Sequence, residues 1–198
     1  MSEELDWDTA DPLEIFRLWL SEAETAEPND ANAAALATST PHGVPSVRMV
    51  LVKRIDQRGF CFFTNAESKK GLELAANPVA ALCFHWKSLR RQVRVEGRVS
   101  ELENSEVDAY FHSRSRGSQL GAAVSRQSRP LANRESLVEQ VQNFGKEHPG
   151  EVPRPEYWRG YCVGGDRIEF WKDGADRLHD RFLFESSAGG WTKTRLYP

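Results

Sequence analysis

Residues 44–64 read VPSVRMVLVKRIDQRGFCFFT, and this stretch decides the fold. Its first half, Val44–Lys53, is mostly apolar and rich in valine, which is typical of a strand. The polar residues Asp56–Gly59 favour a turn, and Phe60–Thr64 returns to the pattern of a strand. A strand, a turn and a second strand in direct succession predict an antiparallel hairpin.

Further strands follow on both sides of this hairpin, with helices between some of them. Strands are predicted over residues 34–40, 79–86, 91–102, 157–172, 177–184 and 191–196, and Gly164-Gly165 can interrupt the one at 157–172. Helices are predicted over residues 11–23, 68–76, 104–112, 118–124 and 135–146. Many short strands with peripheral helices predict a mainly β fold (α+β), built as a closed or partly closed antiparallel barrel.

The composition describes one soluble domain. The 198 residues are 39% hydrophobic and 28% charged, which is typical of neither a disordered nor a membrane protein. No apolar run approaches the roughly 20 residues that a membrane span needs, and a net charge of -3 does not favour a general nucleic-acid binder. We expect a single domain over residues 1–198, with a flexible acidic segment at 1–10, a proline-rich internal linker at 149–156 and a cytoplasmic location.

The spacing of the cysteines and the absence of common catalytic motifs exclude several kinds of site. Cys61, Cys83 and Cys162 lie far apart in apolar stretches, so we expect buried, reduced thiols. Neither they nor the histidines have metal-ligand spacing, and no metal site is predicted. The sequence contains no Gly-x-Gly-x-x-Gly, no Walker loop and no Gly-x-Ser-x-Gly elbow, so a Rossmann or P-loop nucleotide site and a serine hydrolase are disfavoured.

Cationic side chains instead recur at the ends of strands. Arg48 and Lys53 are five residues apart, so a regular strand would point them to opposite faces. Either they serve two different ligands, or the strand contains a bulge. Ser68-Lys69-Lys70 opens a predicted helix, where backbone N–H groups and two lysines suit a phosphate.

The run Arg177-Leu178-His179-Asp180-Arg181 carries the most distinctive set of polar groups. In the predicted strand at 177–184, Arg177, His179 and Arg181 share one face because side chains alternate. That face is either solvated, or it lines a site that combines cations and a proton-transfer group near an anion.

Seven stretches, in a matching order along nearly the whole chain, resemble the pyridoxine (pyridoxamine) 5′-phosphate oxidase family. They are residues 48–53, 63–65 with 68–70, 91–93, 110–114, 125–128, 168–171 and 177–181. The resemblance implies a Greek-key-like, FMN-binding split β-barrel that forms a homodimer with FMN at the subunit interface. It implies a flavoprotein of vitamin B6 metabolism that oxidises pyridoxine 5′-phosphate, pyridoxamine 5′-phosphate or both to pyridoxal 5′-phosphate. Molecular oxygen is the implied acceptor, with hydrogen peroxide as product.

The resemblance also implies a role for each matching residue. The residues implied to bind FMN are Arg48, Met49, Val50, Leu51, Phe63, Thr64, Lys69, Lys70, Gln92, Gln127, Ser128, Trp171 and Arg181, with Gln127 and Ser128 expected from the partner chain. The residues implied to bind the phosphorylated B6 substrate are Lys53, Tyr110, Arg114, Ser118, Arg177 and His179. Arg177 and His179 are also the implied catalytic pair, over the substrate's pyridine ring.

Other interpretations remain open. A related split-barrel flavin oxidase of the phenazine-biosynthesis type shares the Arg-Leu-His region but tends to lack the substrate-phosphate residues. A non-catalytic protein that binds flavin or pyridoxal phosphate would carry similar motifs. An RNA-binding role for the basic residues between Lys87 and Arg98 is disfavoured by the net negative charge.

Long family members also carry an Arg-Arg-x-Tyr-like lid segment, and the acidic residues before Asp11 include neither arginine nor tyrosine.

Overall fold

The computed structural model describes residues 11–198. Its strands are β1 (Ala33–Ser39), β2 (Pro45–Asp56), β3 (Gly59–Asn65), β4 (Val79–Trp86), β5 (Arg91–Glu101), β6 (Trp158–Val163), β7 (Arg167–Lys172), β8 (Asp180–Ser187) and β9 (Gly190–Arg195). Its helices are α1 (Pro12–Ala26), α2 (Lys69–Ala76), α3 (Asn104–Ser113), α4 (Arg116–Val124), α5 (Arg134–Glu147) and the short 3₁₀ turn η1 (Ala175–Arg177). The acidic segment at 1–10, which we expect to be flexible, lies outside the described residues.

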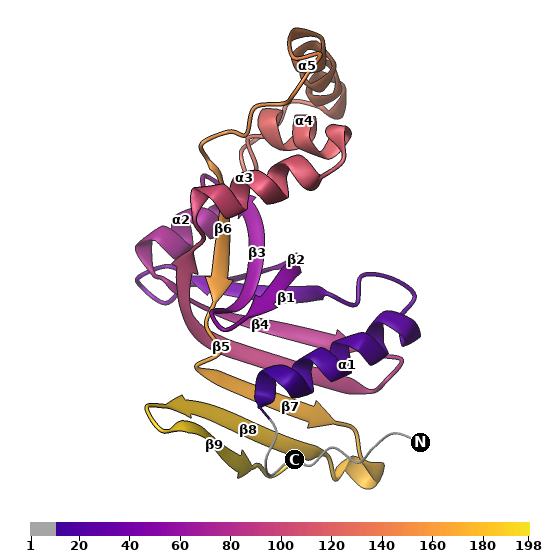
Figure 1. Ribbon diagram of the computed structural model, residues 1–198, viewed down its shortest axis with the longest axis vertical. Coiled ribbons are helices and arrows are strands. Elements are labelled where there is room, and N and C mark those ends of the chain that lie inside the picture. Colours follow the sequence, from indigo (N-terminus) through magenta and orange to yellow (C-terminus); the bar gives the residue numbers. More distant parts are fainter. Residues whose placement is uncertain (1–10) are drawn as a thin grey trace.

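The strands form one antiparallel sheet that closes into a barrel at one end. Their order is β4-β1-β2-β3-β6-β5-β7-β8-β9, and an additional pairing of β4 with β5 closes the first six strands. β7, β8 and β9 continue the sheet below the barrel (Figure 1). This arrangement confirms the predicted mainly β barrel with peripheral helices, and the break at Gly164-Gly165 separates β6 from β7 as predicted.

β5 belongs to both parts of the sheet. Residues Arg91–Glu96 pair with β7 on one side and with β4 on the other, whereas Val99–Glu101 pair with β6. One long strand therefore connects the barrel to its extension without a break in hydrogen bonding.

The hairpin of β2 and β3 contains the bulge that the spacing of Arg48 and Lys53 allowed. Val52 pairs with Phe62 and Arg54 pairs with Cys61, so Lys53 is the extra residue. Before the bulge β2 alternates regularly, with Arg48 turned inward and Lys53 exposed on the opposite face. At the turn Gly59 has φ of +117°, and a Cβ there would lie 2.1 Å from the Val163 carbonyl oxygen, so only glycine fits.

The core lies inside the barrel and under α1. The Asp11 side chain accepts a hydrogen bond from the Leu13 N–H at 2.8 Å, which confirms the predicted N-cap. α1 buries Phe16 and Trp19, and the Phe16 ring lies 4.8 Å from the rings of Phe60 and Phe84. Burying such a side chain contributes about 1.5–3 kcal/mol, so this face of α1 holds it against the sheet.

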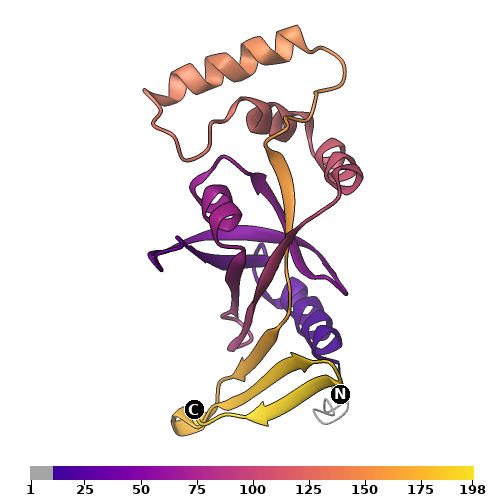
Figure 2. The ribbon, with the colours of Figure 1, turned by 90° about the vertical axis from the view of Figure 1, so that its left-hand side faces the viewer.

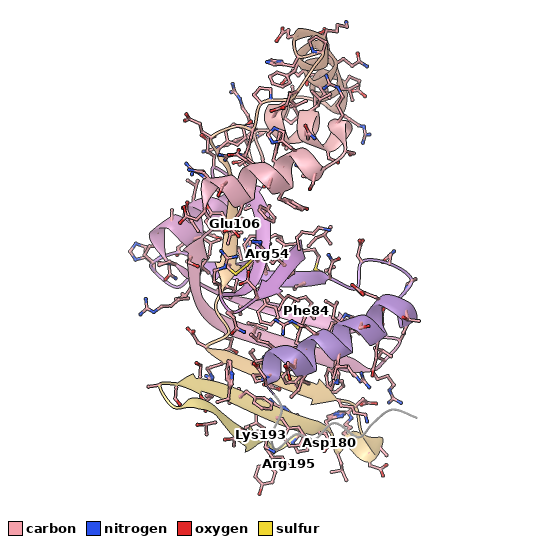
Figure 3. The ribbon with its side chains drawn as sticks, viewed as in Figure 1. Arg54, Phe84, Glu106, Asp180, Lys193 and Arg195 are labelled. Atoms are coloured by element: carbon pink, nitrogen blue, oxygen red, sulfur yellow. A yellow bond between two sulfur atoms is a disulfide. The ribbon has the colours of Figure 1, made fainter. Side chains whose placement is uncertain are left out.

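α3, α4 and α5 extend beyond the barrel on the side opposite β9 (Figure 2). α3 is held by Glu106, whose side chain lies against that of Arg54 on β2 (Figure 3) and also contacts Arg58 at 2.7 Å. The proline-rich segment at 149–156 packs against α3, because Val152 is buried and Arg154 contacts Asp108. No helix among residues 11–198 is long and apolar enough to cross a membrane.

The structure corrects the expectation of three reduced thiols. Cys61 and Cys162 are directly opposite each other on β3 and β6 and form a disulfide, whereas Cys83 is free. The two cysteines are 101 residues apart in the sequence and meet only because β3 pairs with β6. The sequence alone does not show this pairing.

We expect thiol titration to distinguish these states directly. The unfolded, non-reduced protein should show one reactive thiol, Cys83, and reduction should raise the number to three, the total cysteine content. Reduction should also lower the free energy of unfolding by about 2–5 kcal/mol, because a long loop is no longer closed in the unfolded chain. Three reactive thiols without reductant would exclude the disulfide.

Candidate functional site

A hollow of about 210 Å³ opens beside β2 and β3, below the start of α4. Its lining residues are Met49, Val50, Leu51, Lys53, Phe63, Thr64, Lys70, Tyr110, Arg114, Gln127 and Trp158. All of them except Trp158 are predicted site residues. Met49, Leu51 and Lys53 share the exposed face of β2, so strand alternation alone supplies both apolar and cationic groups to this hollow.

Lys70 places a buried ammonium group in the hollow. Its side chain is 7% exposed, and its Nζ donates to Gln127 Oε1 at 2.9 Å and to Thr64 Oγ1 and Ser68 Oγ at 3.2 Å. Burial, together with the nearby Arg48 guanidinium, lowers the pKa of Lys70 to about 8. All the hydrogen-bond acceptors found for it in residues 11–198 are neutral, so a bound anion would stabilise this group.

Glu73 on α2 organises the cations behind Lys70. Arg48 lies 3.4 Å from Glu73 Oε2 and donates to the Leu36 carbonyl oxygen, and Lys69 also pairs with Glu73. Burial acts to raise the pKa of Glu73, but hydrogen bonds from Lys69 and from two hydroxyls lower it to about 2. Arg48 and Lys69 therefore flank the hollow without lining it, each held by the same carboxylate.

Arg114 supplies a second cation from the turn between α3 and α4. Its guanidinium lies 4.5 Å from the centre of the Trp158 ring, and its Nη1 is buried without a hydrogen-bond partner in the described part of the chain. Burial lowers the pKa of Arg114 and raises that of Tyr110. The Tyr110 ring stacks on Phe63 at 3.9 Å, which fixes its position on the same wall. A buried donor without a partner is uncommon and indicates a missing acceptor.

A second group of predicted residues lies on the sheet extension and outside the hollow. Gln92 is opposite Trp171, and Trp171 is opposite Arg181, so the three side chains form a row across β5, β7 and β8. Arg181 is fixed by Glu169, whose Oε1 accepts from Nε at 2.9 Å and lies 2.8 Å from Nη2. Within one chain these residues do not meet the lining of the hollow.

The prediction of a strand beginning at Arg177 is wrong. Arg177 ends η1, and β8 begins only at Asp180. Asp176 and Arg177 both have positive φ, of 53° and 62°, so the chain turns sharply and strand alternation does not apply. Arg177 is exposed on this turn, whereas His179 is folded back against the Trp171 ring at 4.7 Å. The sequence could not show this, because Arg177 is an unusual residue for the left-handed region.

Gly174 is the residue that allows the turn to close. A Cβ at this position would lie 2.0 Å from the Leu178 carbonyl oxygen. We expect Gly174→Ala to lower the free energy of unfolding by roughly 1–3 kcal/mol in chemical denaturation. Gly189→Ala is the matched control, because a Cβ at Gly189 meets nothing within 4 Å. Equal stability of the two variants would contradict this account of the turn.

The segment after α4 carries Gln127 and Ser128, which we expect to reach the site from a partner chain. Within one chain, Gln127 already contacts Lys70 and Thr64. Ser128 is exposed with φ of 69° and lies outside the hollow. Ser118 lies in the first turn of α4, where its hydroxyl accepts from Ser115 at 2.9 Å, and it does not line the hollow either.

Sequence reasoning missed the groups that hold the predicted residues in place. Glu73 and Glu169 are buried carboxylates that fix arginines, Asp173 lies beside His179, and Trp158 supports Arg114. A charged residue at a buried strand position, as in Ile168-Glu169-Phe170, was the available signal for Glu169.

Comparisons with known proteins agree with this architecture. Residues 20–145 match the family described as "Pyridoxamine 5'-phosphate oxidase", and residues 158–198 match "Pyridoxine 5'-phosphate oxidase C-terminal dimerisation region". In structure, the chain is similar to PhzG from Burkholderia lata 383 in complex with tetrahydrophenazine-1-carboxylic acid, with a TM-score of 0.92 and 32% identity over 98% of this chain and 95% of that one. The fold thus defines a split-barrel protein.

Sequence relatives narrow the class to one family. Proteins named pyridoxine/pyridoxamine 5'-phosphate oxidase from Rhodospirillum rubrum and Gluconobacter oxydans are 56% and 54% identical to this chain. The alignments cover 95% and 96% of this chain, and 96% and 95% of the relatives. The chain belongs to the pyridoxamine 5'-phosphate oxidase family.

Proposed function

We propose that the protein is an FMN-dependent oxidase that converts pyridoxine 5′-phosphate, pyridoxamine 5′-phosphate or both to pyridoxal 5′-phosphate. The observation that carries the proposal is one hollow with two cations, the buried Lys70 and the half-buried Arg114, that lack anionic partners among residues 11–198. Two phosphate-bearing ligands, a cofactor and a substrate, match two such cations.

The residues around Lys70 fit FMN. Lys70, with Thr64 beside it and Arg48 and Lys69 behind it, would hold the FMN phosphate at the start of α2, where the backbone N–H groups also favour an anion. The exposed strand from Met49 to Leu51 would lie along the flavin ring. Bound FMN would accept a hydride from C4′ of the substrate and pass the electrons to molecular oxygen, which yields hydrogen peroxide.

The residues around Arg114 fit the substrate phosphate. Arg114, Lys53 and Tyr110 line one part of the hollow and offer two cations and a hydroxyl to a phosphate dianion. Hydrogen bonds to charged groups contribute roughly 1.5–3 kcal/mol each, enough to anchor the substrate away from its reacting carbon. Arg177 would orient the pyridine ring and His179 would assist proton movement. The oxidised amine substrate would release ammonia on hydrolysis.

A homodimer would complete the site. The hollow of about 210 Å³ is smaller than the roughly 300–1,000 Å³ of common ligand pockets. Val47 and Met49 on the outer face of β2 are 68% and 63% exposed, which is unusual for large apolar side chains on neighbouring positions. A second copy that covers this face would add its own row of Gln92, Trp171 and Arg181, with Arg177 and His179, to the hollow.

A phenazine-type oxidase is the second candidate, because the solved structure with the TM-score of 0.92 is a PhzG protein in complex with tetrahydrophenazine-1-carboxylic acid. Lys53, Tyr110 and Arg114 argue against that class, because all three line the hollow and would suit a substrate phosphate.

Oxygen-dependent turnover tests the proposal. The purified protein, reconstituted with FMN, should form an aldehyde and hydrogen peroxide from pyridoxine 5′-phosphate or pyridoxamine 5′-phosphate. Unphosphorylated pyridoxine is the matched substrate control and should react far more slowly, because it offers nothing to Arg114. Turnover of tetrahydrophenazine-1-carboxylic acid but of neither B6 phosphate would favour the second candidate. A protein that binds no FMN would contradict both.

A further inference from the structure

The turn between β7 and β8 holds the His179 ring between several fixed groups. The ring centre lies 4.7 Å from that of Trp171, and His179 Nδ1 lies 3.1 Å from Asp173 Oδ1 and 3.2 Å from the Gly174 nitrogen. In the described part of the chain, the hydrogen bonds and ion pairs of His179 all involve Nδ1, which leaves Nε2 open to a ligand.

Asp173 is itself held in place. Its carboxylate pairs with Arg90 in the turn between β4 and β5, and its backbone N–H donates to the Arg90 carbonyl oxygen at 3.0 Å. Only 15% of the Asp173 side chain is exposed. A carboxylate anchored from a separate turn can therefore fix the imidazole without depending on the turn that carries His179.

The backbone of this turn is strained. Asp176 and Arg177 are consecutive non-glycine residues with positive φ, a conformation that is unfavourable for residues that carry a Cβ. Two contacts offset part of the strain: the Leu178 N–H donates to the Ala175 carbonyl oxygen at 2.9 Å, and the His179 ring packs against Trp171. Strain of this kind persists where the surrounding contacts impose one geometry, and here that geometry sets the position of the imidazole.

The two neighbours of Nδ1 favour opposite tautomers. The Gly174 N–H can donate only to an unprotonated Nδ1, which would put the proton on Nε2. The Asp173 carboxylate can only accept, so it favours a proton on Nδ1 and a free lone pair on Nε2. The Asp173 carboxylate carries a full negative charge 3.1 Å from Nδ1, whereas the Gly174 amide is neutral, so the stronger electrostatic interaction favours the proton on Nδ1.

We propose that Asp173 is a positioning residue that holds His179 in the Nδ1–H tautomer and turns a basic Nε2 toward the substrate. The proposal rests on the proposed function for its consequence in catalysis. As the substrate's 4′-hydroxyl or amine is oxidised, its O–H or N–H proton would pass to Nε2, and Asp173 would offset the charge of the imidazolium that forms. Besides Asp173, the charged groups around this segment are Arg90, Lys172, Asp176, Arg177 and Asp180, and Asp180 is paired with Arg195 at 3.0 Å.

Nitrogen-15 NMR of the histidine rings tests the tautomer without any turnover. With FMN-loaded protein labelled at histidine, at a pH where the imidazoles are neutral, His179 should show a protonated Nδ1, with His179→Gln to assign its signals. Asp173→Asn should move the proton to Nε2, because the Gly174 N–H then determines the tautomer. Asp176→Asn is the matched control, since it removes a carboxylate from the same turn and asparagine tolerates the left-handed backbone. A protonated Nε2 in the unsubstituted protein would overturn the proposal, whether or not any variant folds.

Kinetics separate a positioning role from a merely structural one. Asp173→Asn should lower kcat about 100-fold with little change in KM, and Asp173→Glu should restore part of it. Asp176→Asn should leave both constants within twofold. An unchanged kcat in Asp173→Asn would overturn the catalytic consequence. If the unsubstituted protein oxidises neither B6 phosphate, the proposed function fails, while the NMR result still decides the tautomer.

Discussion

Arg114→Ala is expected to raise KM for pyridoxine 5′-phosphate roughly 10- to 100-fold while leaving FMN in place. The reason is the buried Arg114 Nη1, which has no hydrogen-bond partner among residues 11–198 and gains one only when an anion enters the hollow. One charge-assisted bond contributes about 1.5–3 kcal/mol, which corresponds to this change in affinity. The measurement is steady-state oxidation beside flavin content after denaturation.

The control for Arg114 removes the same charge elsewhere. Arg129 is exposed on the loop between α4 and α5, outside the hollow, so Arg129→Ala should leave KM within twofold. Loss of FMN from Arg114→Ala with KM unchanged would reverse the division of the two phosphate positions. An unchanged KM with FMN retained would remove Arg114 from the site.

Lys70→Met is expected to act in opposite directions on cofactor binding and on the stability of the protein without FMN. It should weaken FMN binding by at least about 10-fold, because it removes a cation from the phosphate position. In the absence of FMN it should stabilise the fold, because methionine fills similar space without a buried charge beside Arg48. The lowered pKa of Lys70 corresponds to a cost on the order of 3 kcal/mol.

The lowered pKa of Lys70 also predicts how the stability of the FMN-free protein changes with pH. Lys70 in the folded chain loses its proton near pH 8, whereas in the unfolded chain it keeps the proton up to its ordinary pKa of 10.5. Between these values the unfolded state binds more protons, so the free energy of unfolding of the FMN-free protein should rise with pH. Lys70→Met should abolish that rise in urea denaturation series. Lys69→Met, which removes an exposed lysine, is the matched control and should keep it.

Local patterns predicted the strands well because each strand is a short apolar run bounded by a turn. Val44–Lys53 and Phe60–Thr64 became β2 and β3, and Arg48 and Lys53 lie on opposite faces of β2, as their spacing of five predicts for a regular strand. The prediction of a strand from Arg177 failed, because Asp176 and Arg177 adopt the left-handed backbone conformation, and the following His179 is held by contacts with Trp171 and Asp173 rather than by local preference.

The missed parts of the site depend on contacts between distant segments. Glu73 is on α2, yet it fixes Arg48 on β2, and Cys61 meets Cys162 only because β3 pairs with β6. A single sequence shows which side chains carry charge but not which of them pair across the sheet. The resemblance to a family identified the candidate residues, whereas the strand pairing in the structure shows which residues lie next to them.

The separation of the hollow from the row on β5, β7 and β8 has a genetic consequence. If each site combines the hollow of one subunit with the row of the other, two inactive chains can complement each other. A mixed dimer of an Arg114→Ala chain and an Arg177→Ala chain would concentrate both defects in one site and leave the other intact. Co-expression of the two variants should therefore restore up to half of the normal activity per mixed dimer, which neither homodimer can reach.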